Sequence, residues 1–104
     1  MGKYAVIVSQ RADSMLVKHV RFLAQVSIPA AKRVVDEFEK ILDTLEESPC
    51  QFPPENSYNI PPGFRKALFC KWYKAVFSVN EEKREVYLDA VLDCRQDQSE
   101  YRPK

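Results

Sequence analysis

The strongest constraint on the fold is a series of apolar residues that recurs at steps of three and four between residues 31 and 45. The members of this series are Ala31, Val34, Val35, Phe38, Ile41, Leu42 and Leu45. This spacing places them on one face of an α-helix, and Pro49 ends the pattern. Asp36 and Lys40 form an i,i+4 pair on the opposite, polar face. Because a helix with one apolar face must cover it, the chain has to supply a second layer.

Another helix is predicted just before this series, and a short strand before that. The strand runs from Tyr4 to Val8; it is apolar, rich in β-branched residues and too short for a helix. Ser9 follows it and can cap the next helix. In that helix, apolar residues recur at helical spacing at Ala12, Leu16, Val20, Leu23 and Val26. Residues 27–29, which include Pro29, break the chain between the two helical patterns. Because only a few residues join them, we expect an antiparallel helical hairpin.

The remainder of the chain has the composition of a loop followed by β-strands. Four prolines within residues 50–62 predict a structured loop that can carry a short turn of helix. Three segments rich in aromatic and β-branched residues follow it, at 67–69, 72–79 and 84–92. Residues 80–83 predict a hairpin turn, and Cys70 and Lys71 an earlier reversal. The order predicts a two-layer α+β fold, in which the helical hairpin packs on a curved antiparallel sheet made by the first strand and a three-stranded C-terminal meander.

Size and composition indicate one ordinary globular domain spanning residues 1–104. The chain is 45% hydrophobic and 30% charged, a balance typical of folded proteins. No apolar run approaches the roughly 20 residues of a membrane span, and the first residues do not resemble a signal peptide. We therefore expect a soluble, cytoplasmic protein with no membrane partner. A net charge of +1 argues against nucleic-acid binding by bulk charge, so any such contact must be local.

The same composition argues against cofactors, metals and disulfides. The three cysteines, Cys50, Cys70 and Cys94, are far apart and form no CxxC pair. The one histidine, His19, is interpreted as a surface residue. Two glycines are too few for a phosphate-binding loop or a dinucleotide fingerprint. Cys94 adjoins Arg95, which favours its thiolate, but a buried small residue is the simpler interpretation.

A group of basic residues on the predicted strands is the candidate functional feature. Its members are Arg65, Lys66, Lys71, Lys74 and Arg95. Strand ends converge in a meander, and these cations can hold an RNA backbone, although a solvated sheet face is the alternative. Tyr101 can stack on a base, or else fix the tail to the domain. Asp93 and Asp97 flank Arg95 and can serve as a general base or only hold the arginine.

The whole chain resembles the RelE/ParE-family toxins of bacterial type II toxin–antitoxin, or plasmid stabilisation, systems over about residues 3–101. The resemblance rests on the order and spacing of several segments rather than on any single one. These segments are residues 4–12, the helical hairpin, residues 45–49, Phe64 with Arg65, residues 72–77 and residues 91–95.

This resemblance implies a cognate antitoxin as partner and one of two activities. RelE-like members cut mRNA in the ribosomal A site, whereas ParE-like members poison DNA gyrase and have no known nuclease site. The catalytic positions of the RelE-like members fall on Arg65, Lys74, Arg95 and Tyr101. At Ala67 a family lysine is missing, and Lys74 replaces an arginine. The resemblance is compatible with a homodimer or a toxin–antitoxin hetero-oligomer.

Ribosome-dependent mRNA cleavage is the activity we expect, because Arg95 and Tyr101 keep the spacing of the corresponding residues in the RelE-like members. Attack by a 2′-hydroxyl also needs a general base, and Arg65 stays protonated. That role is left open among Lys66, Lys74, Asp93 and Tyr101. Gyrase poisoning, or an inactive chain that only binds its partner, are the alternatives. The nuclease interpretation requires the four candidate side chains to gather at one rim of the sheet. The antitoxin is expected in the groove between helical hairpin and sheet, or along an edge strand.

Overall fold

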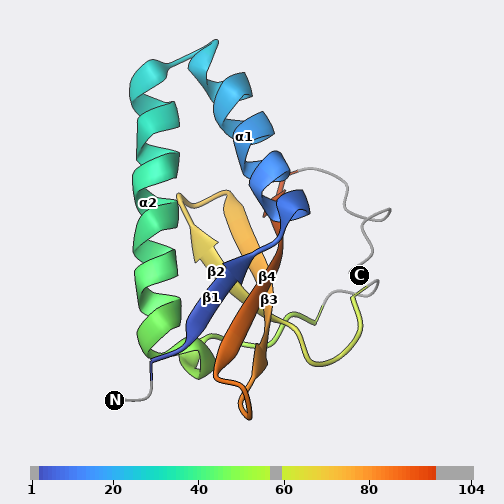
Figure 1. Cartoon of the computed structure of the whole chain (residues 1–104). Helices are drawn as coiled ribbons and strands as arrows, with labels where there is room; N and C mark the ends of the chain where they lie inside the picture. Colours follow the sequence, from blue (N-terminus) through green and yellow to red (C-terminus); the bar gives the residue numbers. More distant parts are fainter. Residues whose placement is uncertain (1–2, 57–59, 96–104) are drawn as a thin grey trace.

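The computed structural model describes residues 3–56 and 60–95 of the 104-residue chain. In chain order the elements are strand β1 (Ala5–Val8), helix α1 (Gln10–Ala24), helix α2 (Ile28–Glu47), a 3₁₀ helix η1 (Pro49–Gln51), and strands β2 (Arg65–Phe69), β3 (Tyr73–Asn80) and β4 (Glu85–Asp93). The helices form a hairpin that lies on one face of a four-stranded sheet (Figure 1). The predicted two-layer α+β fold is therefore confirmed.

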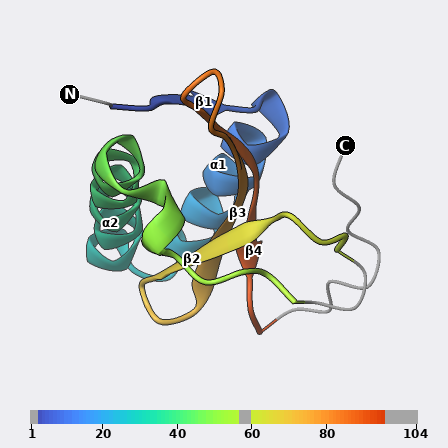
Figure 2. The ribbon, with the colours of Figure 1, turned by 90° about the horizontal axis from the view of Figure 1, so that it is seen from below.

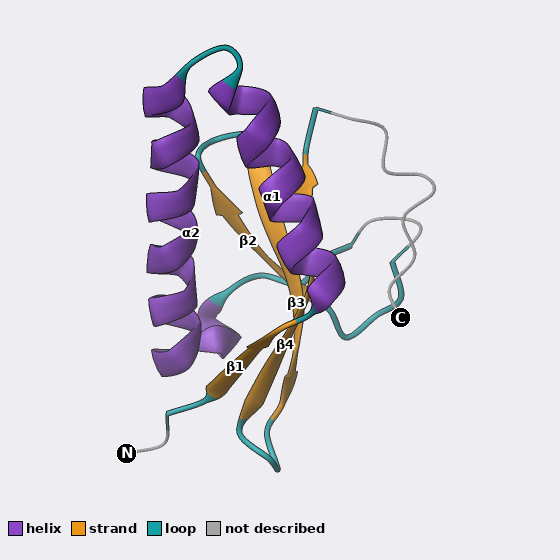
Figure 3. Cartoon of the chain, turned by 45° about the horizontal axis from the view of Figure 1, so that its top comes forward, coloured by secondary structure: helices purple, strands orange, loops and turns teal. Residues whose placement is uncertain are grey.

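Both helices begin at the serines that precede them. The Ser9 hydroxyl accepts a hydrogen bond from the Ala12 amide at 2.9 Å, and the Ser27 hydroxyl accepts one from the Ala30 amide at 3.2 Å. Each serine thus satisfies an amide that has no partner within its helix. Pro29 occupies the first turn of α2, where its fixed φ suits the helix. The two helices stand side by side, with their connecting turn at the end away from β1 (Figure 3).

The sheet differs from the prediction in one respect, which is the direction of its first strand. The strand order is β1-β4-β3-β2, and β1 pairs with β4 in parallel, so the sheet is mixed rather than antiparallel. The helical hairpin explains this direction, because α2 brings the chain back to the start of β1. There, the Tyr4 amide donates a hydrogen bond to the Glu46 carbonyl at 2.9 Å. β2 then runs in the same direction as β1, and two reversals give β4 that direction too.

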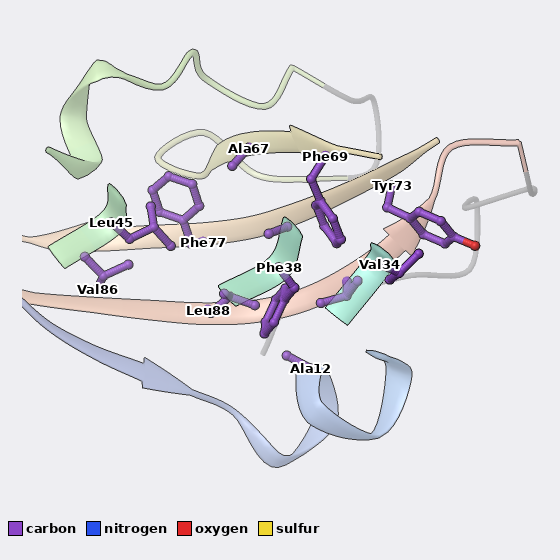
Figure 4. Close-up of a cluster of buried hydrophobic side chains, with 12 residues drawn as sticks. Ala12, Val34, Phe38, Leu45, Ala67, Phe69, Tyr73, Phe77, Val86 and Leu88 are labelled. Atoms are coloured by element: carbon purple, nitrogen blue, oxygen red, sulfur yellow. The ribbon is translucent and has the colours of Figure 1, made fainter. Parts of the chain in front are cut away.

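The main core fills the space between the helices and the sheet (Figure 4). Phe77, Leu88 and Val86 point from the central strands and are fully buried. Val34, Phe38 and Leu45, three members of the periodic series in α2, meet them from the other layer. This arrangement is the second layer that the apolar face of α2 requires.

A second, smaller core lies on the opposite face of the sheet. The segment between η1 and β2 crosses this face, away from the helices (Figure 2). Ile60 packs there against Val76, Ala90 and Leu92, and Phe64 lies beside them. The same segment pairs with the outer edge of β2, where the Glu55 amide donates to the Phe64 carbonyl at 2.8 Å. The predicted structured loop is therefore a strap, residues 52–64, whose described part covers the outer face.

Candidate functional site

Arg65 fastens the end of the helical layer to β2. Its guanidinium Nη1 donates to the backbone carbonyls of Phe52 at 2.6 Å and Cys50 at 3.2 Å. Both carbonyls belong to the turn that leaves α2, where helix-end carbonyls lack partners. Among the described residues, the Arg65 guanidinium therefore donates to backbone carbonyls.

Lys74 lies on the outer face of the sheet, under the strap. Its side chain is 9% exposed and pairs with the Glu55 carboxylate, whose side chain is 2% exposed. The ammonium group of Lys66 lies 3.9 Å from the other Glu55 oxygen. A buried charge is tolerated when its partner is in contact, and here two lysines satisfy one carboxylate. This group attaches the strap to β2 and β3.

Arg95 is the most accessible of the three described candidates, with a side chain 47% exposed. Its Nε and Nη2 donate to the two oxygens of Asp93 at 3.1 and 2.9 Å, and its own amide donates to Asp93 as well. The guanidinium carbon lies 5.0 Å from the centre of the Trp72 ring, within the range of a cation–π contact. Arg95 is therefore held by a carboxylate and an indole ring at the end of β4.

The role of Asp93 follows from these contacts. Burial raises the pKa of Asp93, but the hydrogen bonds and charge of Arg95 outweigh burial and hold the pKa below its usual value. A carboxylate with a lowered pKa is a poor proton acceptor at neutral pH. Of the two interpretations offered for Asp93, holding the arginine is the one its geometry supports.

The structure does not gather all the candidate cations at one place. Lys66 and Lys74 share the Glu55 carboxylate, whereas Lys71 and Arg95 share the Trp72 ring. Arg65 pairs in register with Phe77, and Lys74 with Leu68, an odd number of residues further along the strands. Because neighbouring residues of a strand alternate between faces, Arg65 and Lys74 lie on opposite faces of the sheet. The prediction that they share one rim with Arg95 is wrong for this pair. Tyr101 and Asp97 lie outside the described residues, so a catalytic role for Tyr101 stays a prediction.

One side chain near Arg95, that of His19, was misread in the sequence. His19 is half-buried rather than on the surface: its Nε2 lies 3.0 Å from the Val91 carbonyl oxygen, and its ring centre lies 5.2 Å from that of Tyr73. His19 lies four residues from Met15 and four from Leu23, which both pack on the core. This helical spacing was the signal in the sequence that the His19 ring faces inward. Tyr73 is itself buried, and it links His19 to the Arg95 and Trp72 end of the sheet.

The surface is also hollowed near Arg95 and Trp72. A cavity of about 460 Å³ lies between the turn of the helical hairpin and the β2–β3 turn. We call it the basic pocket, because Arg33, Lys71 and Arg95 line it together with Trp72. Its remaining lining residues are Leu23, Ser27, Pro29, Ala30, Val34, Cys70 and Tyr73.

The cysteines have no catalytic environment. Cys94 is exposed, which corrects its interpretation as a buried small residue, and loss of hydration around its thiol raises the pKa, so the thiolate is not favoured. Cys50 donates from its Sγ to Glu81 at 2.8 Å, and this hydrogen bond raises the pKa of Cys50. Within the described ranges, no three histidine, cysteine or acidic side chains are grouped as a metal site would need. None of the described helices is long and apolar enough to cross a membrane.

Comparison with known proteins identifies the class. A family model described as the ParE toxin of the type II toxin–antitoxin system parDE matches residues 6–98. The match covers most of the sequence, including both helices, β2, β3 and β4, and β1 from its second residue. The chain therefore belongs to the ParE toxin family of type II toxin–antitoxin systems.

Solved structures agree on the fold. A structure of the chromosomal ParDE toxin–antitoxin system of P. aeruginosa superimposes with a TM-score of 0.69 at 16% identity, covering 89% of this chain and 98% of the other. The toxin–antitoxin complex RelBE2 of Mycobacterium tuberculosis gives a TM-score of 0.60 at 20% identity, covering 88% and 98%. No curated protein sequence matches the chain significantly.

Proposed function

We propose that this toxin arrests bacterial growth by binding and poisoning DNA gyrase, without cutting RNA, and that a cognate antitoxin neutralises it. The family match to ParE toxins supports gyrase poisoning rather than RNA cleavage. The antitoxin partner is supported by the two similar structures, both of which are toxin–antitoxin systems.

The observation that carries the proposal is the burial of Lys74 against Glu55. Cleavage through a 2′-hydroxyl needs cations that face the phosphate while negative charge develops on it. The Lys74 side chain is 9% exposed and its charge is already compensated, and Arg65 donates to two backbone carbonyls. Of the three described catalytic candidates, Arg65, Lys74 and Arg95, only Arg95 has a half-exposed side chain, so these positions offer a phosphate one cation rather than three.

Ribosome-dependent mRNA cleavage remains the second candidate, and one observation favours it. Arg95 lies beside the Trp72 ring, which is 42% exposed, so a cation and an aromatic ring are available at the same place. A phosphate and an unstacked base can use such a pair.

Inducible expression in a bacterial host, followed by two assays, separates these candidates. If the proposal is correct, growth stops, purified protein inhibits DNA supercoiling by gyrase, and cleaved DNA accumulates while mRNA stays intact. Cut mRNA on ribosomes with intact DNA would refute it. Loss of that cutting in the Arg95→Ala/Tyr101→Ala double variant would then assign the nuclease site. Normal growth of the expressing host would instead indicate a chain that only binds its partner.

A further inference from the structure

The basic pocket is the concave feature of the fold that the proposed activity leaves unused. Arg33 reaches it from α2, Lys71 from the β2–β3 turn, and Arg95 from the end of β4. Three elements that are distant in sequence thus place cations around one cavity. Among the described residues that line this cavity, none is acidic.

The positive charge of the basic pocket is only partly compensated by the described residues. Asp93 compensates Arg95 through its two carboxylate oxygens. Neither Arg33 nor Lys71 forms an ion pair with a described carboxylate. Lys71 lies over the same indole ring as Arg95, with its Nζ 5.2 Å from the ring centre. The cavity is therefore lined by more positive than negative charge among the described residues, which favours an anionic ligand.

The turn that presents Lys71 has an unusual backbone. Cys70 and Lys71 have φ angles of +49° and +69°, a conformation that costs non-glycine residues energy. Two contacts hold it in place: the Trp72 carbonyl accepts from the Cys94 amide at 2.7 Å, and the Cys70 thiol lies 3.6 Å from the Arg33 carbonyl. The second contact joins the turn directly to α2. The backbone that carries Lys71 is therefore held against the backbone that carries Arg33.

Exposed apolar residues surround the turn of the helical hairpin, beside this cavity. Phe22, Val26 and Ile28 are 67%, 78% and 60% exposed. They are adjacent in sequence to Leu23, Ser27 and Pro29, which line the basic pocket. An apolar patch beside an electropositive cavity matches a partner that carries both apolar and acidic side chains.

We infer that the basic pocket receives an acidic side chain from a peptide segment of the antitoxin, whose neighbouring apolar side chains cover the exposed turn of the helical hairpin. This inference rests on the proposed function for the identity of the partner. The charge of Arg33 and Lys71 selects the carboxylate, and Phe22, Val26 and Ile28 supply the apolar contact.

A nucleic-acid strand fits the same place less well. The Trp72 ring already carries Lys71 and Arg95, so a base stacked on it would have to displace a cation. The cavity of about 460 Å³ has room for a carboxylate-bearing side chain. Its wall of Leu23, Pro29, Ala30 and Val34 offers a phosphate chain no further cations.

Trp72 makes this inference directly measurable, because it is the only tryptophan of the chain. Purified full-length protein is titrated with a short peptide of leucine, alanine and glutamate, and its tryptophan fluorescence is followed. The probe's counterpart with glutamine in place of glutamate tests the charge. We expect saturable binding of the glutamate peptide that weakens with added salt, and affinity about tenfold lower for the glutamine peptide.

Charge-reversal variants locate the bound peptide. Arg33→Glu and Lys71→Glu are each expected to weaken binding by about tenfold or more. The matched control is Lys83→Glu in the β3–β4 turn, which changes the net charge equally and should bind as wild type does. Circular dichroism confirms that each variant is folded at the temperature used, and Lys71→Gln repeats the test with half the change in charge.

Three results would overturn the inference. They are equal binding of the glutamate and glutamine peptides, unchanged binding by both charge-reversal variants, and tighter binding of an oligouridylate at the same residues. Peptide binding is measured without reference to growth. A toxin that arrests growth but ignores the peptide would refute the pocket assignment alone, and a chain that binds the peptide without arresting growth would refute the proposed function alone.

Discussion

The buried pair of Glu55 and Lys74 predicts a distinctive pattern of stabilities. Removing one member of a buried ion pair costs about 3–5 kcal/mol, because the other charge is left without compensation. Glu55→Leu leaves the charge of Lys74 without compensation, so we expect the free energy of unfolding to fall by about 3 kcal/mol. Lys74→Met leaves Glu55 with Lys66, whose Nζ is already 3.9 Å away, and should cost less, about 2 kcal/mol.

The double variant Glu55→Leu/Lys74→Met should recover most of this loss. Apolar side chains of similar size often replace a buried ion pair with little cost, so we expect stability within about 1 kcal/mol of wild type. Independent effects would instead add to about 5 kcal/mol. For a domain of this size, a loss of 3 kcal/mol lowers the melting temperature by roughly 12–24 °C.

Urea unfolding followed by circular dichroism measures all four proteins. A double variant as unstable as the sum of the single variants would refute the reasoning, because it would mean that the two charges do not interact. The double variant also tests function. A folded double variant that still arrests growth excludes a direct role for Lys74 at the target, whereas loss of arrest would assign it one.

Three further predictions follow from single contacts. Ser9→Ala should lower the free energy of unfolding by about 1 kcal/mol in urea titration, because α1 loses its cap; an unchanged value would mean that water replaces the hydroxyl. Phe77→Ala should cost about 3–5 kcal/mol by the same measurement, since the ring is fully buried, and a cost below 1 kcal/mol would contradict the described core. The lowered pKa of Asp93 means that its ionised form stabilises the fold above about pH 4 and that this contribution is lost as the pH falls further. The stability difference between wild type and Asp93→Asn should therefore shrink between pH 7 and pH 3, and a constant difference would refute the assigned pair.

The layers of this fold are readable from the sequence, because periodicity is a local property. The series from Ala31 to Leu45 and the cap at Ser9 each depend on residues within one or two turns of helix. The direction of β1 is different: it depends on where α2 ends relative to Tyr4, a contact across the whole helical hairpin. No pattern within residues 4–8 encodes that direction.

The site was less predictable than the fold for the same reason. The identities of Arg65, Lys74 and Arg95 as basic residues were evident, but their partners were not. Glu55 lies in a proline-rich loop with no periodic pattern, so its burial against Lys74 had no signal in the sequence. The pairing of Arg95 with Asp93 was foreseeable, since only Cys94 separates them and the arginine can reach back.

The parallel pairing of β1 with β4 also sets the order in which the chain can complete its structure during synthesis. Ala5 pairs with Glu85 and Val8 with Leu88, so partners are separated by 80 residues. The hairpins among β2, β3 and β4 involve near neighbours and can close early, whereas so distant a pairing forms slowly. β1 therefore stays without its partner strand until β4 has been synthesised, and the sheet is complete only after residue 88 has left the ribosome.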